Sequence, residues 1–376
     1  MTIVLVDDSE TNLFVISTIL KSDGYTDFVT LTSAQAMFTY LETHAQHVDV
    51  ILLDVMMPHM DGIEACRLLK KNEALKDIQV IFVTALEDKK KLSEALDVGG
   101  IDYIVKPINK VDLLARLRVA QRLKAELDWH RQHEQTIQRE LHLASLVQQS
   151  LLSPPLKNDL LSITASYVPS FNLAGDLYYW VALDEHRYGV ILLDMMGHGV
   201  SASLVCMYIS SVMRESIKLL TRPDLVIAEL NRYMNMLHHE QEELSYYFTA
   251  VYFVIDLQKK RVDYVNAGHP TCYALIDEDK VEPLTQTACA VGFFDAMDIE
   301  VKTLRFEQSV QLLLFTDGVL EAMDDNEFEA ERKIQTYMAR RWHSIDRPLY
   351  LLVPSEKQAG QPDDMCVVLL QAGFTD

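Results

Sequence analysis

Short apolar runs alternate with helical patterns over the first third of the chain. Five runs have the length and the apolar character of strands buried on both faces, at residues 3–6, 27–31, 50–53, 80–83 and 103–105. Between them, apolar side chains recur at helical spacing over residues 11–20, 34–41, 63–69 and 89–98. This alternation predicts an α/β domain at residues 1–120, built on a doubly wound five-stranded parallel sheet.

The pattern then changes to that of one long helix. No Gly or Pro occurs between Leu113 and Pro154. Apolar residues fall in a 3-4 register at Leu123, Leu127, Ile137, Leu141, Ala144 and Leu151, and polar residues occupy gaps in that register at His130, Glu134 and Gln148. We interpret residues 121–155 as a helical linker with an imperfect coiled-coil seam that joins two copies of the chain. The alternative is a single helix that buries its apolar residues against its own domains.

The last part of the chain, residues 156–376, predicts an α+β domain of packed sheets. Strand patterns occur at residues 162–168, 178–183, 188–193, 246–255, 262–266, 272–276, 301–306, 311–315 and 366–370. Short turns between several of them indicate antiparallel pairing. Two long helical stretches lie together in the middle, near residues 201–219 and 223–239.

Composition narrows the classes of function. The formal net charge of −21 gives an acidic surface that repels phosphate backbones, so we expect no nucleic-acid binding. The apolar runs are too short to span a bilayer and no signal peptide is evident, so we expect a cytoplasmic protein with no membrane partner. The five cysteines are scattered, which argues against a disulfide framework and favours small buried side chains over reactive thiols.

Polar residues stand at the ends of the predicted N-terminal strands. Asp7 and Asp8 follow the first strand, Asp54 ends the third, Thr84 ends the fourth and Lys106 ends the fifth. The ligand site of such a sheet lies at the carboxyl ends of its strands. Three carboxylates gathered there repel one another unless a cation such as Mg²⁺ neutralises them. A carboxylate beside Mg²⁺ and a lysine can accept a phosphoryl group, because both cations offset charge on the transferring oxygens.

This ordered set, with Asp61 and Gly62 after Asp54 and Pro107 after Lys106, closely resembles the receiver domain of two-component response regulators. The resemblance implies that a sensor histidine kinase phosphorylates Asp54. It further implies Mg²⁺ ligands and switch residues at Asp7, Asp8, the Met56 carbonyl, Thr84, Tyr103 and Lys106. A dianionic group on Asp54 would give Thr84 and Lys106 new partners and shift a two-state surface.

Four acidic spots in the C-terminal part stand where predicted strands end or turns begin. They contain Asp176, Asp194, Asp317, and the pair Asp363 and Asp364. Neighbouring glycines let the backbone approach a metal ion. Carboxylates with few nitrogen ligands suit Mg²⁺ or Mn²⁺, and two such ions can clamp a phosphate for in-line attack by hydroxide.

Taken in order, these spots and the Asn266 to His269 turn resemble the motifs of bacterial PP2C-like (PPM) phosphatases, in the branch that dephosphorylates anti-anti-sigma factors. The resemblance implies that Asp194 bridges two Mn²⁺ or Mg²⁺ ions beside the Met195 carbonyl. It implies Asp176 as support for one ion, and Asp317 with Asp363 on the other; a slip of one residue to Asp364 stays open. Asn266 and His269 would shape the site, and His198 is either a general acid or a structural loop residue.

The chain departs from the family pattern at two positions. Ala174 replaces a glycine, and Tyr179 replaces a second aspartate. Neither change removes an expected metal ligand. We therefore expect a response regulator whose Asp54 controls a metal-dependent protein serine/threonine phosphatase, with a phosphorylated STAS-type anti-anti-sigma protein as its substrate. The alternative is a non-catalytic adaptor that binds a sigma factor or another regulator through a phosphatase-like domain. A DNA-binding regulator is disfavoured, since no basic recognition helix occurs.

Overall fold

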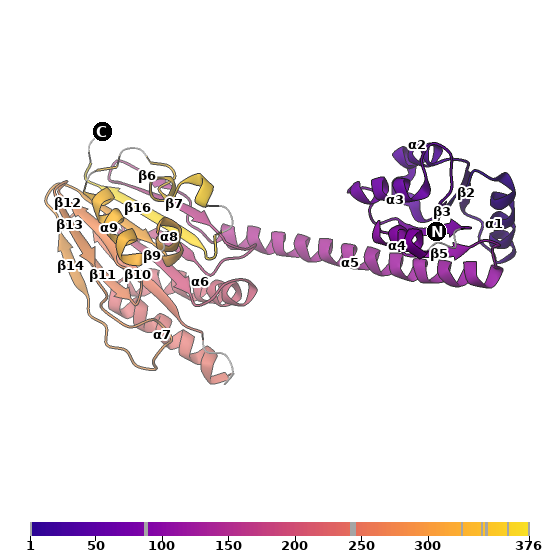
Figure 1. Cartoon of the computed structure of the whole chain (residues 1–376). Coiled ribbons are helices and arrows are strands. Elements are labelled where there is room, and N and C mark those ends of the chain that lie inside the picture. The colour runs from indigo at the N-terminus through magenta and orange to yellow at the C-terminus, as the bar shows by residue number, and fades with distance from the viewer. Residues whose placement is uncertain are drawn as a thin grey trace. The chain divides into compact units, whose positions relative to one another are not determined.

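The structure is a computed structural model that describes residues 2–85, 89–240, 246–324, 326–339, 341–342, 345–358 and 361–374. It divides into two compact units, Met1–Gln138 and Arg139–Asp376. Figure 1 shows both units and labels many of their elements.

The N-terminal unit is built on one five-stranded sheet in which every strand pair is parallel. Its strand order is β2-β1-β3-β4-β5. These strands are β1 (Thr2–Val6), β2 (Phe28–Leu31), β3 (Val48–Asp54), β4 (Gln79–Thr84) and β5 (Asp102–Val105). The helices between and after them are α1 (Glu10–Ser22), α2 (Ala34–His44), α3 (Gly62–Lys71), α4 (Lys89–Asp97) and α5 (Lys110–Ser150), with a short 3₁₀ turn at Ala45–His47.

Helices cover both faces of this sheet. On one face, buried residues of α2, α3 and α4 pack on alternate strand residues such as Val4, Ile51 and Phe82. On the other face, buried residues of α1 and the start of α5 pack on the intervening residues, such as Leu5 and Leu52. Burial on both faces explains why β3 and β4 read as continuous apolar runs. The predicted doubly wound fold is confirmed.

Helix α5 confirms the predicted long helix and begins earlier than expected. Leu113 and Leu117 are fully buried in the core of the N-terminal unit. Further along, Leu127 and Ile137 have 37% and 45% of their surface exposed. The sequence assigned Gln148 to a polar gap in the register of the linker, and the structure buries its side chain in the C-terminal unit. Pairing of α5 with a second copy stays a prediction.

The C-terminal unit contains two antiparallel sheets. The first has the order β14-β11-β10-β9-β8 and the second the order β13-β12-β15-β16-β7-β6. The first consists of β8 (Leu177–Ala182), β9 (Arg187–Met195), β10 (Phe248–Asp256), β11 (Arg261–Ala267) and β14 (Lys302–Arg305). The second consists of β6 (Leu156–Lys157), β7 (Leu161–Val168), β12 (Cys272–Ile276), β13 (Lys280–Leu284), β15 (Val310–Phe315) and β16 (Met365–Ala372).

The two sheets pack face to face between two layers of helices (Figure 1). Residues from both inner faces, among them Trp180, Phe253 and Leu312, form the central core. Helices α6 (Val200–Leu220) and α7 (Pro223–Glu240) cover the outer face of the first sheet. Helices α8 (Asp317–Met323), α9 (Glu327–Met338) and α10 (Leu349–Leu352) cover the outer face of the second. The predicted α+β sandwich is confirmed.

Sequence patterns did not predict every element of this unit. Strands β6 and β13, helices α8, α9 and α10, and the 3₁₀ turn at Ser355–Lys357 were all missed. Helix α9 does carry a signal, since Ala330, Ile334 and Met338 are spaced by four and are all fully buried. The sequence of helix α8 gives little signal of a helix, because this element is two turns long and has Gly318 in its first turn.

Candidate functional sites

Strand ends of the N-terminal sheet gather two carboxylates and one ammonium group. Asp7 and Asp54 are buried, with 1% and 3% of their surfaces exposed. The Lys106 Nζ lies 2.9 Å from Asp7 Oδ2 and 3.1 Å from Asp54 Oδ1. Asn12 and the Ser9 amide donate to the other side of the Asp7 carboxylate. Burial alone would lower the pKa of Lys106, but its contacts with both carboxylates outweigh this and raise it.

Asp8 completes a set of three carboxyl groups that could hold a cation. One oxygen each from Asp7, Asp8 and Asp54 lies within 4.8 Å of the others. Burial, followed by the charge of Asp7, raises the pKa of Asp54 despite the nearby Lys106. Three carboxylates with one ammonium leave excess negative charge, so this all-oxygen set fits a hard divalent cation such as Mg²⁺.

The loop after β3 is held close to this set by a glycine. A Cβ atom on Gly62 would lie 2.1 Å from the Asp54 carbonyl oxygen, so no other residue fits there without displacing the end of β3. The Gly62 amide donates to the Val55 carbonyl at 3.0 Å. Met56 is exposed in the same loop, and its amide hydrogen-bonds the Asp54 carboxylate.

Thr84 and Tyr103 occupy neighbouring strands beyond these groups. Thr84 is buried at the end of β4, and its carbonyl accepts a hydrogen bond from the Lys106 amide at 2.8 Å. Tyr103 on β5 is half-buried, with the Arg116 guanidinium 5.7 Å from its ring centre. The structure therefore places all seven residues predicted for this site in or beside the ends of β1, β3, β4 and β5.

A second acidic site lies in the C-terminal unit, where each sheet contributes one strand pair. Antiparallel pairing sets the start of β8 beside the end of β9, and the end of β15 beside the start of β16. Asp194 lies at the end of β9. The other three aspartates lie within two residues of the remaining strand ends, namely Asp176 before β8, Asp317 after β15 and Asp363 before β16. We call these four residues the C-terminal acidic cluster. The Asp194 carboxyl lies within hydrogen-bonding reach of the Asp176 and Asp317 carboxyls.

Electrostatics of the C-terminal acidic cluster favour a cation. Burial, and then the charges of Asp194 and Asp364, raise the pKa of Asp176 well above its ordinary value. Burial, and then Asp317 and Asp363, do the same for Asp194. Within the described residues, no Lys or Arg forms an ion pair with the four carboxyls of the cluster. Buried like charges require a counterion, and a set of oxygen ligands suits Mg²⁺ or Mn²⁺.

Asp363 and Asp364 have different partners. The Asp364 carboxylate is buried and accepts hydrogen bonds from the Ser170 amide and hydroxyl and from the Gly175 amide, at 2.7–2.9 Å. Asp363 is half-buried and accepts one hydrogen bond, from the Asp364 amide. Asp364 therefore fixes the loop before Asp176, while Asp363 keeps one carboxylate oxygen available.

Thr316 is a residue of this site that the sequence did not single out. It stands at the N-cap of α8, but its hydroxyl does not cap that helix. Instead the Thr316 Oγ1 donates to Asp176 Oδ2 at 2.8 Å and accepts from the Cys366 amide at 3.0 Å. Its position directly before Asp317 was the only available signal. Gly318 is fixed in the same way as Gly62, since its Cβ would lie 2.2 Å from the Asp364 carbonyl oxygen.

Asn266 and His269 form hydrogen bonds with the strands that lead to the C-terminal acidic cluster. The Asn266 side chain is buried, donates to the Leu284 carbonyl and accepts from the His269 amide. The His269 Nε2 lies 3.0 Å from the Phe315 carbonyl, so it carries the proton, and Nδ1 then accepts from the Thr249 hydroxyl at 2.8 Å. Thr249 pairs with Asp194 across the sheet. His269 therefore links the strands that carry Asp194 and Asp317.

The neutral state of His269 predicts acid sensitivity. Burial lowers its pKa to about 4, below the value of about 6.5 in an unfolded chain. A depressed pKa gives stability that is complete above pH 6.5 and is lost as the pH falls toward 4. The stability advantage of the wild type over His269→Gln should thus shrink by about 2 kcal/mol between pH 7 and pH 4.5. Urea unfolding of both proteins at each pH measures it, and a constant difference would contradict the assignment.

Among the described residues, no hydrogen bond links His198 to the carboxyl groups of the C-terminal acidic cluster. It is exposed, and its ring stacks on Phe171 with centres 4.8 Å apart. Its charge slightly offsets the rise in the pKa of Asp363, which burial chiefly causes. The general-acid role stays a prediction, and the stacked geometry gives His198 a place at the rim of the site.

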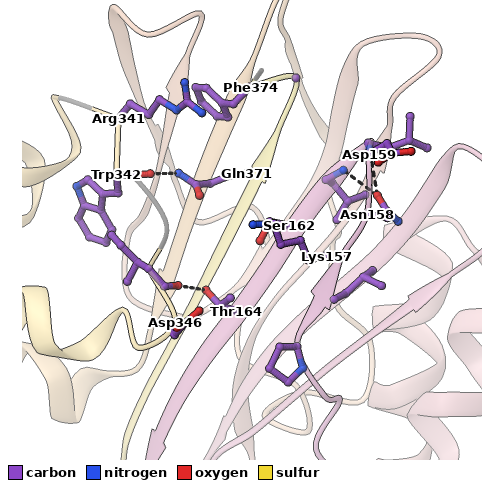
Figure 2. Close-up of a pocket in the computed structure, with 16 residues that line it drawn as sticks. Lys157, Asn158, Asp159, Ser162, Thr164, Arg341, Trp342, Asp346, Gln371 and Phe374 are labelled. Carbon is purple, nitrogen blue, oxygen red and sulfur yellow. Dashed lines mark hydrogen bonds between the residues drawn. The ribbon is translucent and has the colours of Figure 1, made fainter. Parts of the chain in front are cut away.

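A pocket of about 230 Å³ lies elsewhere, at the opposite end of β7 and β16 (Figure 2). Its lining includes Lys157, Thr164, Trp342 and Gln371. Gln371 donates to the Trp342 carbonyl, and Thr164 donates to the Ile345 carbonyl. Because Met365 pairs with Val168 and Gln371 with Ser162, this pocket is separated from Asp364 by the length of β16. The pocket is therefore distinct from the acidic site.

Comparison with known families assigns both units. The family described as Stage II sporulation protein E (SpoIIE) matches residues 184–373, which is just over half of the chain. The chain belongs to the SpoIIE family. The family described as the response regulator receiver domain matches residues 3–118. This SpoIIE-family protein therefore carries a receiver domain fused to a PP2C-like domain, as the sequence motifs predicted.

Curated relatives each match part of the chain. Phosphoserine phosphatase RsbP of Bacillus subtilis (strain 168) is 39% identical over 183 residues, covering 49% of this chain and 45% of RsbP. Phosphoserine phosphatase RsbU of the same organism is 24% identical over 244 residues, covering 63% of this chain and 71% of RsbU. Response regulator PleD of Caulobacter vibrioides (strain NA1000 / CB15N) is 38% identical over 133 residues, covering 35% of this chain and 28% of PleD. The chain thus spans less than half the length of RsbP and of PleD.

Among solved structures, the SiaA-PP2C domain of Pseudomonas aeruginosa matches with a TM-score of 0.50 and 18% identity, covering 65% of this chain and 99% of that domain. At this identity the likeness establishes the fold of the C-terminal unit. None of the helices in the described parts of the chain combines the length and the hydropathy that a membrane crossing requires.

Proposed function

We propose that this SpoIIE-family protein is a metal-dependent protein serine/threonine phosphatase whose activity is controlled by phosphorylation of Asp54. The observation that carries the proposal is the convergence of Asp176, Asp194, Asp317 and Asp363 without a basic partner among the described residues. The relatives RsbP and RsbU, which are named phosphoserine phosphatases, support the same reaction.

The positions of the four carboxyls suggest their roles in holding Mn²⁺ or Mg²⁺. Two divalent ions at this site would polarise the phosphate ester and supply a hydroxide for in-line attack. Asp194 lies between Asp176 and Asp317 and would contact both ions, with the Met195 carbonyl nearby. Asp176 would support one ion, while Asp317 and Asp363 would hold the other. The hydrogen bonds on Asp364 support Asp363 as the ligand of this pair.

The receiver residues would control this reaction from the N-terminal unit. A sensor histidine kinase would transfer a phosphoryl group to Asp54, with Mg²⁺ held by Asp8, Asp54 and the Met56 carbonyl and assisted by Asp7. Lys106 already contacts the Asp54 carboxylate and would pair with the transferred group. Thr84 would bond to it and Tyr103 would turn inward, which is how an added dianion biases a two-state surface.

The substrate and the assembly form the finer part of the proposal. We infer a cytoplasmic phosphoprotein of the STAS-type anti-anti-sigma class as the substrate, on the strength of the motif resemblance. The names of RsbP and RsbU, which are phosphoserine phosphatases, support a phosphoserine group on that substrate. Exposed apolar residues on α5, such as Leu127 and Ile137, support a homodimer formed through the linker. We place the receiver at residues 1–120, the linker at 121–155 and the phosphatase domain at 156–376.

Metal removal tests the catalytic part of the proposal. The full chain, stripped with a chelator, should lose hydrolysis of p-nitrophenyl phosphate and of a phosphoserine protein, and Mn²⁺ should restore both. The reason is that, in the part of the chain that the structure describes, no Lys or Arg forms an ion pair with the C-terminal acidic cluster and could bind a phosphate in place of the metal. Folded protein that binds Mn²⁺ but hydrolyses neither substrate would contradict the phosphatase and favour the adaptor, for which a stoichiometric partner would then be sought.

A further inference from the structure

The last turn of helix α5 is hydrogen-bonded to the segment that leads into Asp176. Gln148 has only 2% of its surface exposed. Its Nε2 donates to the Ala174 carbonyl at 2.7 Å, and its Oε1 accepts from the Ala174 amide at 3.1 Å. The Gln148 side chain thus pairs with Ala174 as a neighbouring strand would, two residues before Asp176.

A second pair of contacts fixes the chain on the other side of Asp176. The Ser153 hydroxyl donates to the Trp180 carbonyl and accepts from the Trp180 amide, both at 3.0 Å. Arg214 of α6 donates to the Leu151 carbonyl and stacks 4.7 Å above the Tyr179 ring. Asp176 is therefore bracketed by hydrogen bonds from Gln148, in the last turn of α5, to Ala174 and from Ser153, three residues after the helix, to Trp180.

The segment around Ala174 has little freedom to absorb a displacement. The Gly175 amide donates to Asp364 Oδ2 at 2.7 Å. A Cβ atom on Gly175 would lie 3.1 Å from the carbonyl oxygens of both Met195 and Gly197, which shows how tightly the two loops pack. A shift of Ala174 would therefore move Asp176 relative to Asp194, because packed interiors transmit small displacements.

We propose that Gln148 is a positioning residue that couples helix α5 to Asp176, and that α5 controls the C-terminal acidic cluster through this contact. The helix runs without interruption from Lys110 to Ser150, and Leu113 and Leu117 in its first turns lie in the core of the N-terminal unit. A rotation or shift of α5 on phosphorylation of Asp54 would act on Ala174 through both hydrogen bonds of the Gln148 amide. The coupling rests on the proposed function, since it regulates the same site.

The substitution Gln148→Met tests the coupling, because methionine keeps the length of the side chain and removes both its donor and its acceptor. Gln149→Met is the matched control, since Gln149 is the exposed neighbour on the same turn. Both variants and the wild type are studied as full chains, with and without acetyl phosphate. Hydrogen–deuterium exchange of residues 172–182 reports the coupling independently of catalysis. Release of p-nitrophenol reports activity and is insensitive to phosphate released from acetyl phosphate.

We expect acetyl phosphate to change both readouts in the wild type and in Gln149→Met, with a change in rate on the order of tenfold. In Gln148→Met the ratio of the rates with and without acetyl phosphate should fall to about one. The hydrogen–deuterium exchange of residues 172–182 should no longer respond, while Asp54 is still phosphorylated. A response of normal size in Gln148→Met would overturn the proposal, as would unaltered exchange of this segment in phosphorylated wild type.

Further results separate a failure of the coupling from misfolding of the variant and from a failure of the proposed phosphatase activity. If Gln148→Met does not unfold cooperatively, Ser153→Ala takes its place, and an undiminished response there overturns the proposal. The wild type could show no phosphatase turnover and still change its hydrogen–deuterium exchange on phosphorylation. If Gln148→Met abolished that change in exchange, the coupling would be supported and the phosphatase activity rejected. A simple loss of fold stability would lower the fraction of active protein without changing the ratio that acetyl phosphate produces.

Discussion

Asp194→Asn is expected to lower Mn²⁺-dependent phosphatase turnover on the order of 10³-fold, with the protein still folded. Asp194 is the member of the C-terminal acidic cluster within reach of both Asp176 and Asp317, so its loss would impair the binding of both ions. Asparagine keeps the shape and removes the charge. Removing one of several buried like charges should not weaken the fold, because the pKa of Asp194 is raised by burial and by its acidic neighbours.

Asp184→Asn is the matched control for this substitution. Asp184 is exposed in the turn between β8 and β9, where it pairs with Arg187. Its replacement should leave turnover within about twofold of the wild type, because exposed ion pairs contribute little. Initial rates over a range of Mn²⁺ concentrations measure both variants. If Asp194→Asn turned over substrate about as fast as the wild type, the C-terminal acidic cluster would have no role in phosphate hydrolysis.

Asp54→Asn is expected to abolish the response of the phosphatase to acetyl phosphate, bringing the ratio of rates with and without the phosphodonor to about one. In the wild type this ratio should differ from one on the order of tenfold, the usual size of coupling between two sites. Asparagine cannot form the acyl phosphate, and it also weakens the contact of Lys106 with residue 54. Basal turnover without phosphodonor should remain, since Asp54 takes no part in hydrolysis.

Glu42→Gln provides the control in the receiver. Glu42 is exposed on α2, and its replacement also removes one negative charge. It should keep both the phosphorylation and the response of the wild type. If Asp54→Asn still responded to acetyl phosphate as the wild type does, the phosphodonor would act at another position and control through Asp54 would be rejected.

The arrangement of the candidate site residues in the receiver could be predicted closely, because each of them stands at or near the end of a strand that the apolar pattern predicts. In a parallel sheet every carboxyl end of a strand meets the same edge, so assigning β1, β3, β4 and β5 brings Asp7, Asp54, Thr84 and Lys106 together. The contacts of Lys106 with Asp7 and Asp54 confirm that geometry. The functional roles of these residues stay predictions until phosphorylation is measured.

The C-terminal acidic cluster could be predicted only in part. Turn motifs located its aspartates, but the groups that fix them are distant in the sequence. Thr316 is 140 positions from Asp176, and Asp364 is 189 positions from Gly175. Periodicity describes local structure and carries no information about such pairs. Only the structure assigns Asp364 to the loop.

Gln148 shows a different limit of sequence reasoning. The 3-4 register of the linker continues through Gln148, so the pattern predicted a polar seam position. The helix does continue, and in its last turn the Gln148 side chain is buried and bonded to Ala174 of the C-terminal unit. Periodicity gives the face of a helix on which a residue lies and cannot give the partner that covers that face.

Control of the phosphatase through Asp54 is tested most directly by the rate of p-nitrophenol release by the full wild-type chain with Mn²⁺, before and after stoichiometric phosphorylation of Asp54. We predict metal-dependent turnover whose rate changes on phosphorylation, on the order of tenfold. Equal rates from the fully phosphorylated and the unphosphorylated protein would contradict it.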